Sequence, residues 1–139
     1  MNFQIRDFTI KDYEGAIDLW KTDPNIGLGS ADDKDNIERF LDRNPGLSKV
    51  VCAGEEIVAT VLCGHDGRRG HVYHLFVDEK YRRKGLGRKI VDNCLEALRK
   101  EGINKCHLFP FKRNELGKNF WKATAWKERD DIVLFSKDI

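Results

Sequence analysis

The chain has 139 residues, a length typical of one small domain that can bury its own core, and we expect a single domain over residues 1–139. Its 25 Lys and Arg residues nearly balance 23 Asp and Glu residues, so the net charge of +2 gives no global reason to expect nucleic-acid or membrane binding. The sequence has no Cys-x-x-Cys pair, no apolar run approaching about 18 residues and no signal-peptide pattern, which predicts a cytoplasmic protein with reduced thiols and no metal.

The first half of the chain shows strand and helix patterns in turn. Thr9 can cap a helix, because apolar residues recur after it at helical spacing as far as Trp20. The predicted elements are a strand over Phe3–Arg6, a helical region from Thr9 to Trp20, a break over Asp23–Ser30, a second helix through Ile37 and Leu41 that ends near Asn44, and strands over Ser48–Ala53 and Glu56–Cys63.

The second half continues with a turn at Asp66-Gly67 and a strand over His71–Val77, which completes an antiparallel meander. A helix over Lys84–Lys100 has one apolar face, and Gly102 is a suitable stop after it. The remaining predicted elements are a strand over Lys105–Phe109, a helix from Asn114 to about Ala123 and a last strand over Asp131–Ser136. These elements predict an α/β (α+β) fold in which helices cover a mixed sheet.

A basic, glycine-bearing turn lies between the strand His71–Val77 and the helix that follows it. Gly85 and Gly87 lack a Cβ, so the backbone can approach a ligand closely, and the start of the helix adds its positive dipole end. Cationic side chains suited to phosphates surround the glycines: Arg82, Arg83, Lys84, Arg88 and Lys89. The turn therefore predicts an anion site; the alternative is a solvated basic helix start.

This turn matches neither common nucleotide motif. Arg88 follows Gly87 where a P-loop needs Lys, and Ile90 stands where a dinucleotide fingerprint needs a third glycine. A nucleic-acid patch is a further alternative, but the turn has no interleaved aromatic residue beyond Tyr81 and no nucleic-acid motif. What remains is the pattern Arg82-x-x-Gly85-x-Gly87.

That pattern resembles the pyrophosphate-binding motif of the GNAT family of N-acetyltransferases, and the likeness extends over His71–Val91. A second stretch follows the spacing of the family's second motif, through Asn114, Gly117, Phe120, Trp121, Ala125 and Trp126. The short length and the stretch Gly64–Gly70 are most similar to the small bacterial YpeA-like acetyltransferases. The resemblance implies a GNAT-type fold: a mostly antiparallel central sheet of six to seven strands, helices on both faces and a splayed cofactor cleft.

The resemblance also implies where acetyl-coenzyme A binds as co-substrate. Backbone groups of Leu75, Phe76 and Val77 would pair with the pantetheine arm. The adenosine diphosphate end would contact the loop and the first turn of the helix, at Arg82, Arg83, Lys84, Gly85, Leu86, Gly87 and Arg88. Asn114 matches a position that touches pantetheine or orders the cleft, although a helix N-cap is an equally good interpretation. Trp121 could pack under the acyl group.

In this family the acetyl group passes to a primary amine, here of a small molecule, a peptide N-terminus or a lysine. We expect direct transfer in a ternary complex, because no motif places a cysteine as nucleophile and a thioester needs no metal. A backbone N–H near Phe76 or Val77 would hold the oxyanion.

The chain departs from the family's pattern at two positions, one that concerns the acid step and one in a turn. Trp121 stands where the family usually has a tyrosine as general acid, and an indole N–H cannot protonate a thiolate. Solvent could supply that proton, or Tyr73 could substitute. Ala125 stands where the family has glycine. The missing tyrosine keeps a second class open, a non-catalytic module that binds or senses acyl-coenzyme A.

Candidate bases and acceptor contacts lie on other elements. His71 and His74 could each relay a proton near neutral pH, although a strand histidine is more often packed or exposed without a role. Carboxylates at the start of the second helix could attract a cationic amine, or could simply reflect the charge preference of a helix start: Asp32, Asp33, Asp35 and Glu38. Exposed strand edges could pair two copies into a homodimer.

Overall fold

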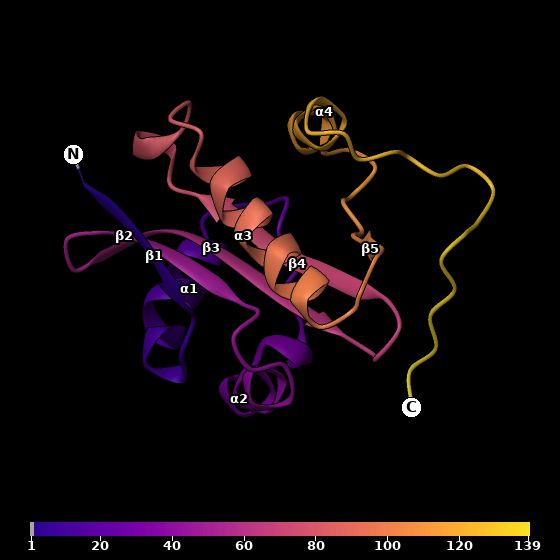
Figure 1. Cartoon of the computed structure of the whole chain (residues 1–139), viewed down its shortest axis with the longest axis horizontal. Coiled ribbons are helices and arrows are strands. Elements are labelled where there is room, and N and C mark those ends of the chain that lie inside the picture. The colour runs from indigo at the N-terminus through magenta and orange to yellow at the C-terminus, as the bar shows by residue number, and fades with distance from the viewer. Residues whose placement is uncertain (1) are drawn as a thin grey trace. The chain divides into compact units, whose positions relative to one another are not determined.

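A computed structural model describes residues 2–139 (Figure 1). The chain divides into one unit that ends at Phe109 and a second from Pro110 to Ile139, and each is described by itself. That the two together form one domain stays a prediction.

The first unit contains a five-stranded sheet in the order β1-β2-β3-β4-β5. Antiparallel ladders join β1 to β2, β2 to β3 and β3 to β4, and β5 runs parallel to its neighbour β4. The strands are β1 (Phe3–Asp7), β2 (Lys49–Ala53), β3 (Glu56–His65), β4 (Gly70–Val77) and β5 (Cys106–His107). The predicted meander is confirmed, with Gly54 at φ +64° in the turn between β2 and β3.

The expectation of six to seven strands is wrong. Asp131–Ser136, predicted as the last strand, has no strand structure and pairs with none of the strands that the described residues form. Its apolar residues favour a strand, but a strand is stable only when its backbone groups are paired, and Phe135 is 88% exposed. The predicted strand Lys105–Phe109 is also shorter, because only Cys106 and His107 pair with β4.

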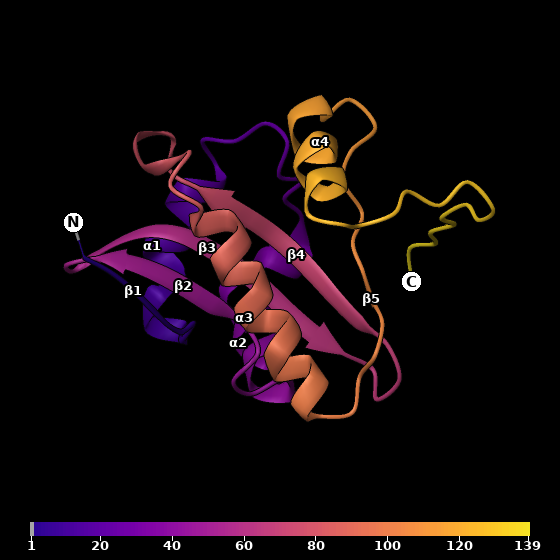
Figure 2. The ribbon, with the colours of Figure 1, turned by 45° about the horizontal axis from the view of Figure 1, so that its top comes forward.

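Helices cover both faces of the sheet, as predicted. In Figures 1 and 2, α3 (Leu86–Lys100) lies on one side, and α1 (Tyr13–Trp20) and α2 (Lys34–Arg43) lie on the other. A Cβ added to Gly70 would meet Leu98 of α3, whereas one added to Gly64 would meet Phe40 of α2. Short 3₁₀ turns are η1 (Ile10–Asp12), η2 (Ser30–Asp32) and η3 (Glu79–Tyr81). No helix within residues 2–139 is long and apolar enough to cross a membrane.

Hydrophobic burial holds these layers together. On the side of α1 and α2, Trp20 is fully buried and belongs to a cluster of eight buried residues: Phe8, Ala16, Trp20, Ile37, Val50, Cys52, Leu62 and Phe76. On the other side, the predicted apolar face of α3 buries Leu86, Ile90, Val91, Cys94 and Leu98. Each large apolar side chain so buried contributes about 1.5–3 kcal/mol relative to exposure.

The C-terminal end of α3 confirms the predicted stop at Gly102. Gly102 has φ +83°, and its N–H donates to Arg99 O at 3.0 Å while Ile103 N–H donates to Leu98 O at 3.1 Å. This pair of reversed hydrogen bonds is a Schellman motif, which requires a residue of left-handed conformation after the helix.

In the second unit, α4 (Glu115–Ala123) ends in the same motif with an alanine in the left-handed position. Ala125 has φ +72°, its N–H donates to Lys122 O at 3.2 Å, and Trp126 N–H donates to Trp121 O at 2.9 Å. The rings of Trp121 and Trp126 also pack, with centroids 5.2 Å apart. The departure from glycine noted in the sequence thus places a Cβ where left-handed backbone disfavours one.

We expect Ala125→Gly to raise the free energy of unfolding by about 1 kcal/mol, because it removes the Cβ clash of an alanine at positive φ. Urea unfolding followed by tryptophan fluorescence measures the change. Gly102→Ala is the matched control, and it should destabilise by a similar amount. An unchanged or less stable Ala125→Gly variant would contradict the assignment of strain to this residue.

Candidate functional site

The loop between β4 and α3 surrounds a helix start with cations. Gly85, the N-cap of α3, has φ +76°, and Arg83 is also left-handed at φ +64°. The cationic side chains of the loop and first turn are exposed: Arg82, Arg83, Lys84, Arg88 and Lys89. The first turn reads Leu-Gly-Arg-Lys, without a carboxylate, so unpaired N–H groups and positive charge coincide.

Arg82 also crosses back to the end of β4. Its Nε donates to the backbone carbonyl of Val77 at 2.8 Å, which leaves the other guanidinium N–H groups to bind an anion. The carbonyl of Val77, one of the backbone groups expected to pair with pantetheine, is therefore already engaged. Leu86 and Gly87 are buried, so they contribute backbone rather than side-chain surface.

Strands β4 and β5 part soon after they meet. Their parallel ladder contains only the pairs Gly70↔Cys106 and His71↔His107, although β4 continues to Val77. Beyond His71, this edge of β4 has no ladder partner among the strands of residues 2–139. The divergence agrees with the splayed arrangement that the resemblance implied.

A bulge interrupts β4 on its other edge. The ladder with β3 pairs Thr60 with Phe76 but Leu62 with Tyr73, so β4 has one extra residue between them. His74 lies in the bulge at φ +52°, a conformation that costs a non-glycine residue about 1–3 kcal/mol. Such strain persists only where surrounding contacts hold the residue in place. Here the ring of His74 contacts Asp32, and its carbonyl accepts a hydrogen bond from Thr60.

The ring of His74 contacts a buried carboxylate on the α1 and α2 side of the sheet. Nε2 of His74 lies 2.6 Å from Oδ1 of Asp32, and both side chains are mostly buried. The second oxygen, Oδ2, accepts from the N–H of Gly29 at 3.0 Å, and the backbone carbonyl of Asp32 accepts from the Tyr13 hydroxyl at 2.6 Å. Burial by itself would raise the pKa of Asp32, but the hydrogen bonds from His74 and Gly29 outweigh it and the pKa is lowered.

This pair could not be found from the sequence, which suggested only a group of acidic residues at a helix start. Asp33, Asp35 and Glu38 are exposed, as that interpretation expects, whereas Asp32 is buried. The sequence did suggest His74 as a base and Asp32 as a contact for the amine, but it gave no reason to expect that the two side chains touch. An open cavity of about 330 Å³ adjoins Asp32, and His74 is not among its lining residues, which are Tyr13, Ile17, Lys21, Leu28, Gly29, Asp32 and Asp33.

His71, the other candidate base, lies in an aromatic row instead. Its ring stacks on Tyr73 and Phe109, with centroids 6.1 and 5.8 Å away, and lies 5.7 Å from the ring of His107. Tyr73 also meets Phe40 edge-on. Burial raises the pKa of Tyr73, so its protonated hydroxyl can donate a hydrogen bond at neutral pH but is a weaker acid than an exposed tyrosine.

Asn114 and Trp121 belong to the second unit. Asn114 is the N-cap of α4, because its Oδ1 accepts from the N–H of Gly117 at 2.8 Å. Trp121 packs edge-on against Phe120 and Trp126. The cap and the packing are structural roles, and the expected contacts of both residues with a cofactor stay predictions.

The cysteines are unsuited to nucleophilic attack. Cys52, Cys63 and Cys94 are buried, and Cys106 is partly buried. The Cys94 thiol and burial raise the pKa of Cys63 well above its ordinary range, and burial raises the pKa of Cys106 to about 12. Thiols with such pKa values are not ionised near neutral pH, and the thiolate is the nucleophile. Within residues 2–139, no group of three His, Cys, Asp or Glu side chains is placed to hold a metal ion.

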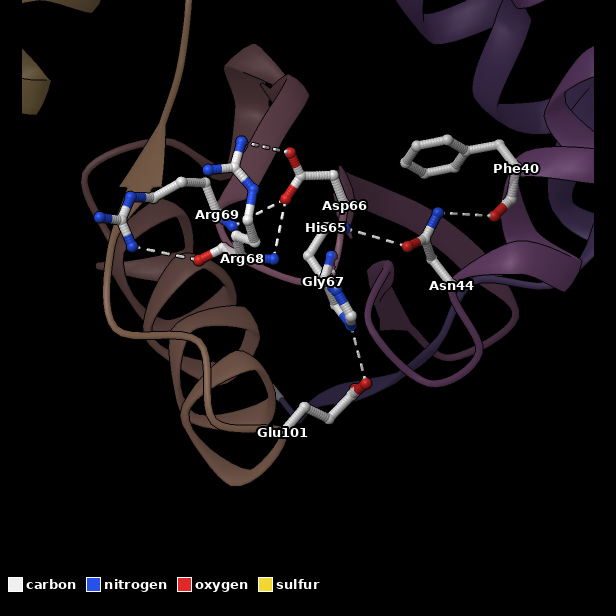
Figure 3. Close-up of polar contacts among 8 residues, drawn as sticks. All are labelled: Phe40, Asn44, His65, Asp66, Gly67, Arg68, Arg69 and Glu101. Carbon is white, nitrogen blue, oxygen red and sulfur yellow. Dashed lines mark hydrogen bonds and ion pairs between the residues drawn. The ribbon is translucent and has the colours of Figure 1, made fainter.

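The turn between β3 and β4, which carried part of the resemblance, has a structural role (Figure 3). Asp66 Oδ1 accepts from the N–H groups of Arg68 and Arg69 at 2.8 and 2.9 Å. His65 joins three elements: its N–H donates to Asn44 Oδ1 at 3.0 Å, after α2, and its Nε2 lies 2.9 Å from Glu101 Oε1, after α3. The polar groups drawn bond to one another, so this turn ties the two helix ends to the sheet.

Acid unfolding tests the Asp32 contact. Because the pKa of Asp32 is lowered from 3.8 in the folded protein, its carboxylate adds stability above that pH, and this contribution is lost as the pH falls through the folded pKa. We expect Asp32→Asn to destabilise the protein at about pH 6 and the difference from wild type to shrink below about pH 4. Urea unfolding over this pH range measures the difference.

Asp33→Asn is the control, since Asp33 is exposed and makes no side-chain cap bond at the start of α2. Its stability should follow that of the wild type at every pH. A difference for Asp32→Asn that stays constant down to the lowest pH would contradict a stabilising, ionised Asp32.

Known proteins resemble this chain in both sequence and structure. Residues 13–125 match the model of the family described as the acetyltransferase (GNAT) family. An acetyltransferase of Pectobacterium atrosepticum is 30% identical over 131 residues, which cover 94% of this chain and 92% of that protein. It is named simply as an acetyltransferase, so the likeness to YpeA-like members stays a prediction.

Solved structures share the fold. The PaiA N-acetyltransferase of Thermoplasma acidophilum, in complex with coenzyme A, superposes with a TM-score of 0.80 at 18% identity, over 94% of this chain and 92% of that one. AAC(6′)-Iy, in complex with the bisubstrate analogue CoA-S-monomethyl-acetylneamine, gives a TM-score of 0.78 at 14% identity over 100% of both chains. The GNAT-type fold is therefore confirmed, with five strands in this chain.

Proposed function

Since this chain belongs to the acetyltransferase (GNAT) family, we propose that it transfers an acetyl group from acetyl-coenzyme A directly to a primary amine in a ternary complex. The observation that carries the proposal is the arrangement around β4. One end of the strand leads into the exposed basic loop before α3, its edge lacks a β5 partner beyond His71, and its bulge presents His74 beside Asp32. Phosphate binding, thioester positioning and amine deprotonation would thus depend on one strand.

The basic loop fits the diphosphate of coenzyme A. N–H groups from Arg83 to Arg88 and the dipole end of α3 would bind phosphate oxygens, while Arg82, Lys84 and their neighbours neutralise the charge. Leu75 would offer backbone groups of the open edge to the pantetheine arm, whereas Phe76, also expected there, pairs with Thr60 and turns its backbone groups toward β3. The carbonyl of Val77 is bonded to Arg82, so only its N–H would take part. Asn114 and Trp121 remain proposed contacts.

The amine would approach from the side of α1 and α2. The cavity beside η2 is lined by Asp32 and Asp33, whose carboxylates favour a cationic group, and its volume of about 330 Å³ suits a small amine or one side chain. The structural neighbour bound to an analogue joining coenzyme A and acetylneamine supports a ternary complex.

The chemistry needs one proton acceptor. The cationic amine would first lose one proton to solvent; its neutral nitrogen would then form a bond to the acetyl carbon, the C–S bond would break with its electron pair going to sulfur, and His74 would take the second proton that the nitrogen loses. Asp32 would orient the ring and stabilise its charged form. The thiolate is a good leaving group, so solvent or the protonated Tyr73 could return a proton to it, and Trp121 need only pack.

Calorimetric titration with acetyl-coenzyme A tests the loop. Gly85 has open space at its Cβ position and φ +76°, a conformation that Asn and Asp tolerate better than other side chains. Gly85→Asp should weaken binding more than tenfold, because it places a negative charge beside the diphosphate, whereas Gly85→Asn should weaken it much less.

Gly54→Asp is the control for folding, since Gly54 also has positive φ, at +64°, and open space at its Cβ position. It should bind as the wild type does. Absence of binding to the folded wild-type protein would refute coenzyme A as the ligand, and equal loss in the Asn and Asp variants would refute the electrostatic role of the loop.

The pH profile of kcat/KM tests the base. His74→Asn keeps a side chain that tolerates positive φ but removes the ring, and we expect a roughly hundredfold loss of kcat/KM together with loss of the acidic limb. His71→Asn, the matched control on the same strand, should keep that limb. If His71→Asn removes the acidic limb and His74→Asn keeps it, the base is His71. Binding of acetyl-coenzyme A without transfer to any amine would favour the non-catalytic module.

A further inference from the structure

A buried hydroxyl contacts the backbone of the bulge in β4. Thr60 lies on β3 with 0% exposure, and its Oγ1 donates to the carbonyl oxygen of His74 at 3.1 Å. The same oxygen accepts from Nε1 of Trp20, also 0% exposed, at 2.8 Å. An indole N–H can only donate and a carbonyl can only accept, so the hydroxyl proton is directed at His74.

Two polar groups, and not the shape of the site, give the reason for a hydroxyl at Thr60: the Nε1–H of Trp20 and the carbonyl of His74. The neighbours of Thr60 in β3, Val58, Ala59, Val61 and Leu62, are buried and apolar, and a valine would have nearly the same shape. The register shift lies next to Thr60, where the extra residue of β4 disturbs the regular ladder. A buried carbonyl without a partner is unfavourable, and the hydroxyl of Thr60 removes that penalty at His74.

The hydrogen bond also sets the direction of the next N–H group. The peptide bonds of the described residues include no cis bond, and in a trans peptide the C=O and N–H groups point in opposite directions. Since the carbonyl of His74 points at Thr60, the N–H of Leu75 points away from Thr60 and Trp20. Leu75 is one of the residues expected to line the pantetheine arm.

We propose that Thr60 is a positioning residue for the transfer reaction: its hydroxyl, held by Trp20, fixes the peptide group between His74 and Leu75 so that the Leu75 N–H donates to the carbonyl oxygen of the acetyl thioester. The inference rests on the proposed acetyl transfer. It places the oxyanion donor at Leu75, one residue before Phe76 and two before Val77, where it was expected, and it assigns Thr60 no contact with either substrate.

Thr60→Val, Thr60→Ser and Ser48→Ala form the test set. Ser48 is the matched control, because its buried hydroxyl also bonds to a strand backbone, accepting from Cys63 N–H at 2.9 Å and donating to Cys63 O at 3.3 Å, away from the bulge. Thr60→Val should lower kcat roughly tenfold to hundredfold with little change in the KM for acetyl-coenzyme A, since the phosphates bind elsewhere. Thr60→Ser should restore most of kcat, and Ser48→Ala should lose stability without losing kcat.

The amide resonance of Leu75 gives a readout that does not depend on turnover. In wild type it should shift between complexes with coenzyme A and with acetyl-coenzyme A, and in Thr60→Val that shift should disappear. A kcat for Thr60→Val equal to that of Ser48→Ala, or a Leu75 shift that Thr60→Val retains, would overturn the inference. If wild type transfers no acetyl group, the proposed function fails, and the Leu75 shift still decides whether Thr60 sets the peptide.

Discussion

The bulge at His74 is the constraint on which the rest of the site depends. It places one extra residue in β4, turns a carbonyl out of the regular ladder and holds a histidine at positive φ. Buried partners from three other elements meet this residue: Thr60 on β3, Trp20 on α1 and Asp32 in η2. A buried polar group left unpaired costs about 1–3 kcal/mol, so these contacts help the apolar cluster to fix how α1 and η2 meet the sheet.

Charged side chains meet the proposed site in two places, although Lys21 lines the cavity together with Asp32 and Asp33. The cations gather at the start of α3, on one face, whereas the cavity carboxylates lie beside α1 and η2 on the other. The near-neutral total hides this division, because balanced charges sum to +2 wherever they lie. An anionic cofactor and a cationic amine would each be drawn to its own side, and β4 is the element they share.

Sequence reasoning succeeded where the signal is local. Periodicity revealed the buried face of α3, Gly102 marked its end, and the spacing of glycines and cations located the basic loop. It failed where a feature depends on distant partners. Residues 131–136 have strand composition but no pairing, and composition cannot reveal whether a partner is present.

The contacts of Asp32 and Thr60 could not be predicted from the sequence either, because their partners are distant in the chain. Asp32 and His74 are 42 residues apart, Trp20 and Thr60 are 40 apart, and neither pair leaves a pattern in the chain. The bulge could not be placed from the residues either, since a histidine in a strand gives no sign of a positive φ. Local chemistry therefore predicted the basic loop, and only tertiary structure brings Asp32, His74 and Thr60 together.

The ring contacts of His74 explain why a glycine would serve less well there in spite of the backbone strain. Glycine would relieve about 1–3 kcal/mol of backbone strain, and its carbonyl could still bond to Thr60. It would lose the ring, however, and with it the charge-assisted hydrogen bond to Asp32 and the contact with Trp20, leaving a buried carboxylate short of its donor. The two losses together are comparable to the strain or exceed it. In the proposed reaction one residue would therefore carry both functions, with its ring serving the amine and its peptide group the thioester, and each is held by a different buried partner.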